Sequence, residues 1–338
     1  SVNAGTLTAM TGDAEVKAKT DATIGTLKAE AGGATIEAMD GALGVTTLNA
    51  KSLTAKAGTT LSAKTLDVKE HAELTSGGDM VLTEAHANTL TANAGGKLTA
   101  TTLGVTGAAG LTSGGAMEVS EATVGSVMAN AGSTLHVKKL TSIGEATLTS
   151  KDEAKLDDVT AGTLAAESTA GSVNAGTLTA TTGNASVTAK TDVKIDALKA
   201  EAGGATIEAT EGKLDVTTLN AKEHAALTSG GAMEVSEATA GSVAAKAGTT
   251  LHVKKLTSTG EATLTSKDEA KLDDVTAGTL AAESTTGSVN AGTLTAKTGD
   301  ASVTAKTDVT IGTLKAEAGS ATVKATEGKL DVTTLNAK

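Results

Sequence analysis

Hydrophobic and polar residues alternate along many short segments of this chain. In "ATVKA", Ala321, Val323 and Ala325 occupy every second position, and Thr322 and Lys324 lie between them. Because successive side chains of a β-strand point to opposite faces, a period of two predicts a strand with one buried face. Thr, Val and Ile favour this conformation. Gly, Asp, Asn, Ser or Lys-Thr separate these segments and suit turns, so the pattern predicts an all-β chain of short strands.

The segments recur at regular intervals. "SVNAGTLTA" begins at Ser1, Ser172 and Ser288, with offsets of 172 − 1 = 171 and 288 − 172 = 116. Residues 111–222 and 227–338 are near-duplicates that differ at about 14 of about 112 positions. The offset of 171 is 9 × 19, and 116 is about 6 × 19.3. The sequence therefore consists of units of about 19 residues.

Each unit contains three alternating segments, which predicts one coil of a three-sided parallel β-helix. We expect about 19–20 residues per coil, about 17 coils (338/19.3), and one continuous domain over residues 1–338. At about 4.8 Å per coil the stack would be about 80 Å long. A coil cannot bury its inward face alone, so its stability would come from stacking on its neighbours.

Composition fits a slender interior. The chain has no Phe, Trp, Tyr, Pro or Cys, so Ala, Val, Leu and Ile must fill the core. Proline would remove a hydrogen bond from a strand ladder. A net charge of −11 argues against nucleic acid as a partner. The absence of cysteine excludes disulfides and thiolate metal sites, and no apolar run reaches the roughly 18 residues of a membrane span.

Two other structures are considered. "SKDEAKLDD" at 150–158 has the appearance of a helical capping box, Ser150 with Glu153. However, "EATLTS" leads directly into it and the unit length stays in phase, which favours a strand and a corner. Global disorder would leave both the alternation and the regular spacing unexplained.

The segments "AGTLTA", "AGTLAAES", "GSVNAGTLTA" and "LTSGGAMEV" carry a family resemblance. They resemble the central repeats of filamentous haemagglutinin-like exoproteins over essentially the whole chain. The resemblance implies a bacterial protein exported by two-partner secretion, a right-handed β-helix, and a role in a long adhesin fibre. It therefore implies a location outside the cell or at the bacterial surface. Neither the secretion domain of that family nor a C-terminal effector domain is evident.

No catalytic constellation is predicted, and no cofactor or metal site. The five histidines are His71, His86, His136, His224 and His252. In "TLHV", Leu and Val would face inward, so His136 and His252 should point to solvent, while "KEH" at 69–71 and 222–224 predicts corners. The acidic residues of 152–158 and 268–274 could offer oxygen ligands to Ca²⁺, but interleaved lysines favour a charged outer corner that discourages sideways association. The glycines predict corners.

Four functions are weighed from the sequence. We expect a structural, non-catalytic rod, the shaft of a surface adhesin, with a cell-surface receptor as a possible partner. The alternative is a filament or sheath subunit that associates with itself, end to end or laterally, through uncapped terminal coils. An ice-binding solenoid ranks lower, because the threonine files of "TLTA" (Thr177, Thr179) meet Ala197 and Lys199 in the next coil. A pectate-lyase-type enzyme would need a groove of convergent acids and cations.

Overall fold

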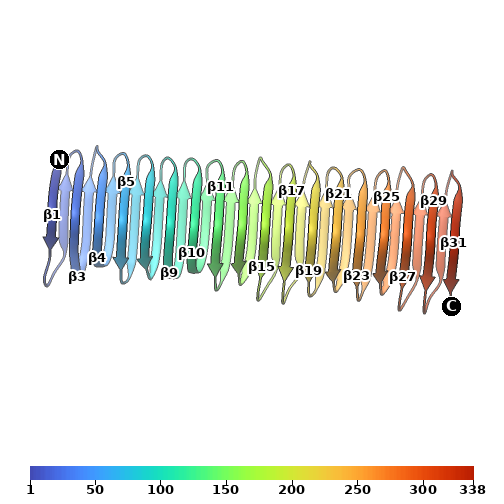
Figure 1. Cartoon of the computed structure of the whole chain (residues 1–338). Helices are drawn as coiled ribbons and strands as arrows, with labels where there is room; N and C mark the ends of the chain where they lie inside the picture. The colour runs from blue at the N-terminus through green and yellow to red at the C-terminus, as the bar shows by residue number, and fades with distance from the viewer. The chain divides into compact units, whose positions relative to one another are not determined.

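The computed structural model describes all residues, 1–338, and contains strands but no helix. The chain divides into two compact units, residues 1–165 and 166–338. Within each unit, strands lie side by side and pair in parallel with the strand one coil later (Figure 1). About 18 turns of a β-solenoid result. This confirms the predicted all-β parallel solenoid and nearly the predicted number of coils.

The first unit contains β1 (Val2–Thr8), β2 (Ala14–Ala18), β3 (Ala22–Ala38), β4 (Leu43–Ala57), β5 (Leu61–Val68), β6 (His71–Ser76), β7 (Met80–Ala87), β8 (Thr89–Ala94), β9 (Leu98–Ser113), β10 (Met117–Ala131), β11 (Leu135–Ser142), β12 (Glu145–Ser150) and β13 (Ala154–Ala161). β14 (Thr163–Ser168) contains the boundary between the units.

The second unit contains β15 (Val173–Ala180), β16 (Ala185–Ala189), β17 (Val193–Ala200), β18 (Ala205–Ala209), β19 (Leu214–Ala221), β20 (His224–Ser229), β21 (Met233–Ala240), β22 (Ser242–Ala247), β23 (Leu251–Ser258), β24 (Glu261–Ser266), β25 (Ala270–Ala277), β26 (Thr279–Ser284), β27 (Val289–Ala296), β28 (Ala301–Ala305), β29 (Val309–Ala316), β30 (Ala321–Ala325) and β31 (Leu330–Ala337).

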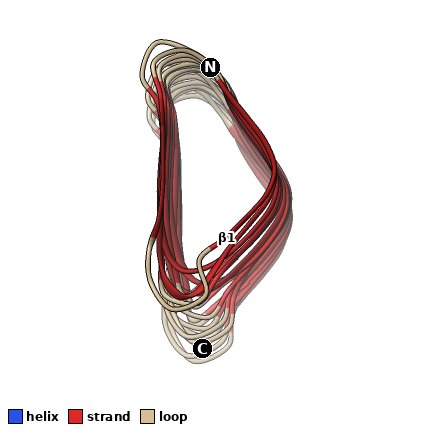
Figure 2. Ribbon diagram, turned by 90° about the vertical axis from the view of Figure 1, so that its left-hand side faces the viewer, coloured by secondary structure: helices blue, strands red, loops and turns tan.

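Each coil has three sides, as predicted. A strand of eight residues such as β11 forms two of them, and it bends where two neighbouring residues, Lys138 and Lys139, both point outward. We call the segment before this bend the first side and the segment after it the second side. The shorter strand that follows, such as β12, forms the third side. Figure 2 shows the coils end-on, with one straight edge and one edge that bends midway.

Coil length varies, yet the register of the sides is kept. Ala22 pairs with Leu43, an offset of 43 − 22 = 21, and Leu43 pairs with Leu61, an offset of 61 − 43 = 18. The extra residues lie in the corners, so the inward positions still align. These two offsets show that coil length varies slightly more than the sequence led us to expect.

The core is a set of inward columns. Leu27, Leu48 and Leu66 stack in register and are 0%, 0% and 2% exposed. Where Ala85 continues this column, its own coil supplies the larger Met80 and Leu90 at other inward positions. Larger residues in this coil thus offset the small alanine, which helps to keep the interior close-packed. A small cavity of about 10 Å³, at the lower limit of what a water molecule needs, lies among residues of β9 to β12.

Glycine is required where corners stack directly. A Cβ on Gly77 would overlap the carbonyl oxygen of Gly58, and Gly95 and Gly114 repeat the same overlap one and two coils further on. No residue of the chain has a positive φ, so close approach of backbones, and not a left-handed conformation, explains these glycines. They lie at corners, as predicted, whereas others such as Gly110 lie within strands.

Carboxylates join some corners to the next coil. Asp79 Oδ1 accepts a hydrogen bond from the backbone N–H of Lys97 at 2.7 Å, and Asp192 accepts one from Lys213 at 2.7 Å.

Residues 150–158 contain no helix: Ser150 ends β12, residues 151–153 form a corner, and β13 begins at Ala154. The interpretation of this segment as strand and corner is therefore confirmed.

Candidate interaction surfaces

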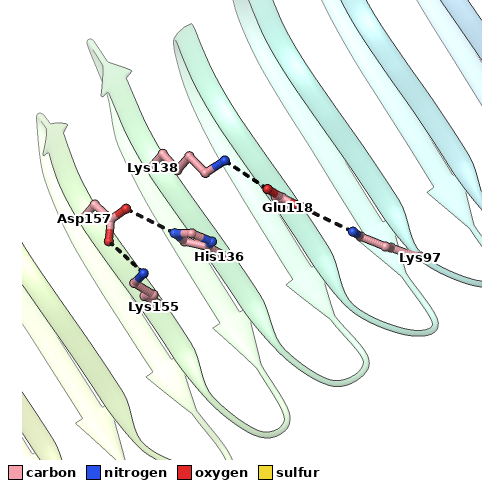
Figure 3. A network of polar contacts seen from close by, with 6 residues as sticks. All are labelled: Lys97, Glu118, His136, Lys138, Lys155 and Asp157. Atoms are coloured by element: carbon pink, nitrogen blue, oxygen red, sulfur yellow. Dashed lines mark hydrogen bonds and ion pairs between the residues drawn. The ribbon is translucent and has the colours of Figure 1, made fainter.

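The outer surface of the first side carries a polar network that crosses four coils of the first unit (Figure 3). Glu118 lies between two lysines, at 3.1 Å from Lys138 Nζ and 3.2 Å from Lys97 Nζ. Hydrogen bonds from Lys138 and Lys97 hold the pKa of the Glu118 carboxyl below its ordinary value. Register explains the proximity, because Glu118 pairs with His136 of the next coil and His136 pairs with Lys155 of the one after.

A second group of contacts lies beside the first and includes a histidine. His136 Nε2 is 3.1 Å from Asp157 Oδ2, and Lys155 Nζ is 3.8 Å from the other oxygen of this carboxylate (Figure 3). The second unit repeats the contact, with His252 Nε2 3.3 Å from Asp273. Exposed ion pairs of this kind contribute little to stability. Their arrangement links neighbouring coils on the outside of the solenoid.

The structure places all five histidines on the outer surface, which confirms the predicted outward orientation of His136 and His252. His71 Nδ1 is 2.8 Å from Thr89 Oγ1, and His224 Nδ1 is 2.9 Å from Ser242 Oγ. His86 Nε2 is 3.2 Å from Glu84. Residues 69–70 and 222–223 form corners, as predicted, and His71 and His224 begin β6 and β20 directly after them.

The acidic segments are divided between two corners. Asp152 and Glu153 lie in the corner before β13, whereas Asp157 and Asp158 lie at the bend between the first and second sides. The chain brings together no group of three His, Asp or Glu residues that could hold a metal ion. Asp157 instead contacts a cation, Lys155.

A hollow of about 490 Å³ opens at the corner between the second and third sides of the first unit. Gly104, Val124 and Ile143 are among the residues that line it, and Ile143 is 81% exposed. Its titratable groups include Asp67 and His86, and the His86 ring lies directly against Gly104. The imidazole also contacts Glu84.

Threonine files are longer than the sequence suggested. The file of Thr179 ends at Lys199 as expected. In the second unit, however, Thr239, Thr257, Thr276 and Thr295 stack in four successive coils. The neighbouring file holds charged residues, and Lys255 Nζ bonds Glu237 at 2.8 Å. The threonine file therefore has charged side chains next to it, and the two files do not form a flat surface of threonine.

The third side of the first unit carries a surface without charge. At two outward positions in each of four successive coils, on β8, β9, β10 and β12, the residues are hydroxyl, amide, glycine or methionine. We call this surface the neutral patch; it consists of Thr91, Asn93, Gly110, Thr112, Met128, Asn130, Thr147 and Thr149. A hollow of about 360 Å³ lies at its edge, next to Met128 and Gly110. The sequence reasoning missed it because the patch exists only once the coils are stacked.

Comparison of the chain with protein families, curated proteins and solved structures gave no match. The resemblance to filamentous haemagglutinin-like repeats therefore stays a prediction from the sequence. No helix of the structure is suited to crossing a membrane.

Proposed function

We propose that this chain is a non-catalytic structural protein, an extracellular segment of the shaft of a bacterial surface adhesin or fibre. The observation that carries the proposal is the continuity of the coil inside each unit. Every coil offers its successor the same parallel ladder and the same inward columns, as in the stacking of Leu198 on Leu219 and of Val216 on Val235. Nearest-neighbour stacking of this kind resists bending and extends by adding coils.

The outer surface supports the same role. Charged side chains pair with each other between neighbouring coils: Lys139 lies 3.0 Å from Glu121, and Lys255 lies 2.8 Å from Glu237. These pairs raise the pKa of both lysines, chiefly through the hydrogen bond to the glutamate. A solvated surface with self-satisfied charges is suited to a shaft that must remain soluble along its length.

Negative-stain microscopy of the full chain over a range of concentrations tests the proposal. A shaft predicts short rods, single or in pairs, that do not grow into fibres at any concentration. Fibres that lengthen with concentration would favour a self-polymerising filament instead, and round particles would contradict both.

A matched pair of variants sharpens this experiment. Leu256→Asp places a carboxylate in an inward column, where Leu256 is 2% exposed, and should disrupt the rod. Thr257→Asp changes the next residue, which points outward, and should leave rods unchanged. If both variants give the same images, the inward column does not support the rod.

A further inference from the structure

The neutral patch is unusual for this chain. Of all residues, 20% are charged and the net charge is −11, so two copies repel each other over most of their surface. At its margins the patch meets carboxylates, among them Glu73 in the preceding coil and Glu145 at the start of β12. A second copy of the chain could approach here without removing a charge from water, which is costly when the charge is left unpaired.

The patch also has relief. Met128 projects from it and is 64% exposed, while its register partner in the preceding coil is Gly110. Packing does not require this glycine: the nearest atom to a Cβ built at Gly110 is the Leu90 carbonyl oxygen, at 3.9 Å. The second unit has alanine at the matching position, Ala226. A ridge and a hollow thus lie side by side at the same level of adjacent strands.

Because Met128 and Gly110 are register partners, the protruding Met128 of one copy can fit the hollow at Gly110 of a second copy. Consider a twofold axis that runs parallel to the strands, midway between residues 108–113 of β9 and residues 126–131 of β10. Rotation about this axis reverses the order of the coils and keeps each position along the strand. It brings Met128 of one copy over Gly110 of the other, and the reverse. The same rotation places Asn130 opposite Thr112, which pairs an amide with a hydroxyl.

The outer coils of the patch follow the same rule. Thr91 lies one coil before Gly110, and Thr147 lies one coil after Met128. The axis therefore brings Thr91 of one copy opposite Thr147 of the other. An isologous contact of this type closes as a dimer and does not propagate.

We propose that the first unit forms an antiparallel, face-to-face dimer with a second copy of this chain through the neutral patch, with Met128 of each copy seated against Gly110 of the other. Four strands at about 4.8 Å and about six residues at about 3.3 Å give a footprint of roughly 400 Å² per copy. This is about half of a standard interface. The dimer should therefore be weak and dependent on concentration.

Sedimentation equilibrium of the full chain tests the proposal with a variant that the molecule itself supplies. Met128→Ala with Asn130→Lys converts "SVMANA" into the "SVAAKA" of the second unit, which the same coil accommodates. We expect the wild-type average mass to rise with concentration and the double variant to associate at least tenfold more weakly. The reverse change, Ala244→Met with Lys246→Asn, is the control and should leave association unchanged. Equal association of wild type and Met128→Ala/Asn130→Lys would overturn the proposal.

Cysteine cross-linking tests the geometry, and the chain has no cysteine of its own. A mixture of Thr91→Cys and Thr147→Cys chains should form a disulfide-linked dimer under mild oxidation, whereas Thr91→Cys alone should not, because the two copies of this residue lie about three coils apart. Thr263→Cys, the position of the second unit that matches Thr147, replaces Thr147→Cys as the control and should not cross-link. Equal cross-linking of Thr91→Cys alone, or none in the mixture, would contradict the antiparallel arrangement.

Discussion

The third sides of the two units differ on the outside and agree on the inside. On β10, Val127, Ala129 and Ala131 face the core, and the matching residues of β22 are Val243, Ala245 and Ala247. Both strands pair with the next coil in the same register. The outward residues have changed, from Met128 and Asn130 to Ala244 and Lys246. Inward positions therefore specify the coil, and outward positions are free to acquire a surface property.

The largest expected effect comes from an inward leucine, and it should be the same in both units. Leu140 and Leu256 occupy matching positions and are 3% and 2% exposed. Leu→Ala at either site removes buried contacts and leaves a cavity, so we expect the free energy of unfolding to fall by about 2–5 kcal/mol. Urea denaturation monitored by hydrogen exchange of the affected coils measures it. A loss in only one unit would show that the two cores are not equivalent.

The second prediction compares glycines that pack against the backbone of the preceding coil with a glycine that has space for a side chain. A Cβ at Gly132 would overlap the Gly114 carbonyl oxygen, and a Cβ at Gly248 would overlap that of Gly230. Gly132→Ala and Gly248→Ala should each destabilise their unit by about 1–3 kcal/mol, as overpacking does. Gly110→Ala meets nothing closer than 3.9 Å and should be neutral or stabilise by about 0.4–1 kcal/mol. Thermal unfolding of the three variants measures this order, and equal losses would contradict it.

Exchange of outward residues between the units should have almost no effect on folding. Ile143 is 81% exposed, and Thr259 occupies the matching position in the second unit. Ile143→Thr should change the free energy of unfolding by less than about 0.5 kcal/mol, because the side chain buries little apolar surface. Chemical denaturation measures this change, and a loss as large as that of the inward leucines would show that Ile143 is covered in solution.

The smallest effect is a difference in acid sensitivity. Lys138 and Lys97 lower the pKa of Glu118 below its ordinary value of 4.5, whereas Lys254 is the main cause for Glu234. A carboxyl with a lowered folded-state pKa stabilises the protein above its unfolded pKa, and this contribution is lost as the pH falls through the folded-state pKa. Between about pH 5 and pH 3, Glu118→Gln should reduce the pH dependence of the urea midpoint more than Glu234→Gln. The opposite order would contradict the two-lysine network.

The sequence predicted the strands, the corners and the inward columns because each follows from local alternation. The contacts between coils could not be predicted with the same success, because they depend on coil length. The hydrogen bond from Lys97 to Asp79 spans 97 − 79 = 18 residues, and the equivalent bond from Lys213 to Asp192 spans 213 − 192 = 21 residues. A single average repeat length misplaces such partners by one or two positions. The neutral patch and the long threonine file were missed for this reason.

The in-register stacking of successive coils is the central claim, and a cysteine pair tests it most directly. Thr257 and Thr276 are register partners on adjacent coils, so their Cα atoms are about 4.8 Å apart, within the range of a disulfide. Thr257→Cys/Thr276→Cys should therefore form an intrachain disulfide under mild oxidation. Thr257→Cys/Asp274→Cys, shifted by two residues along the strand to roughly 8 Å, should remain reduced. A disulfide in the shifted pair but not in the aligned pair would contradict the stacking.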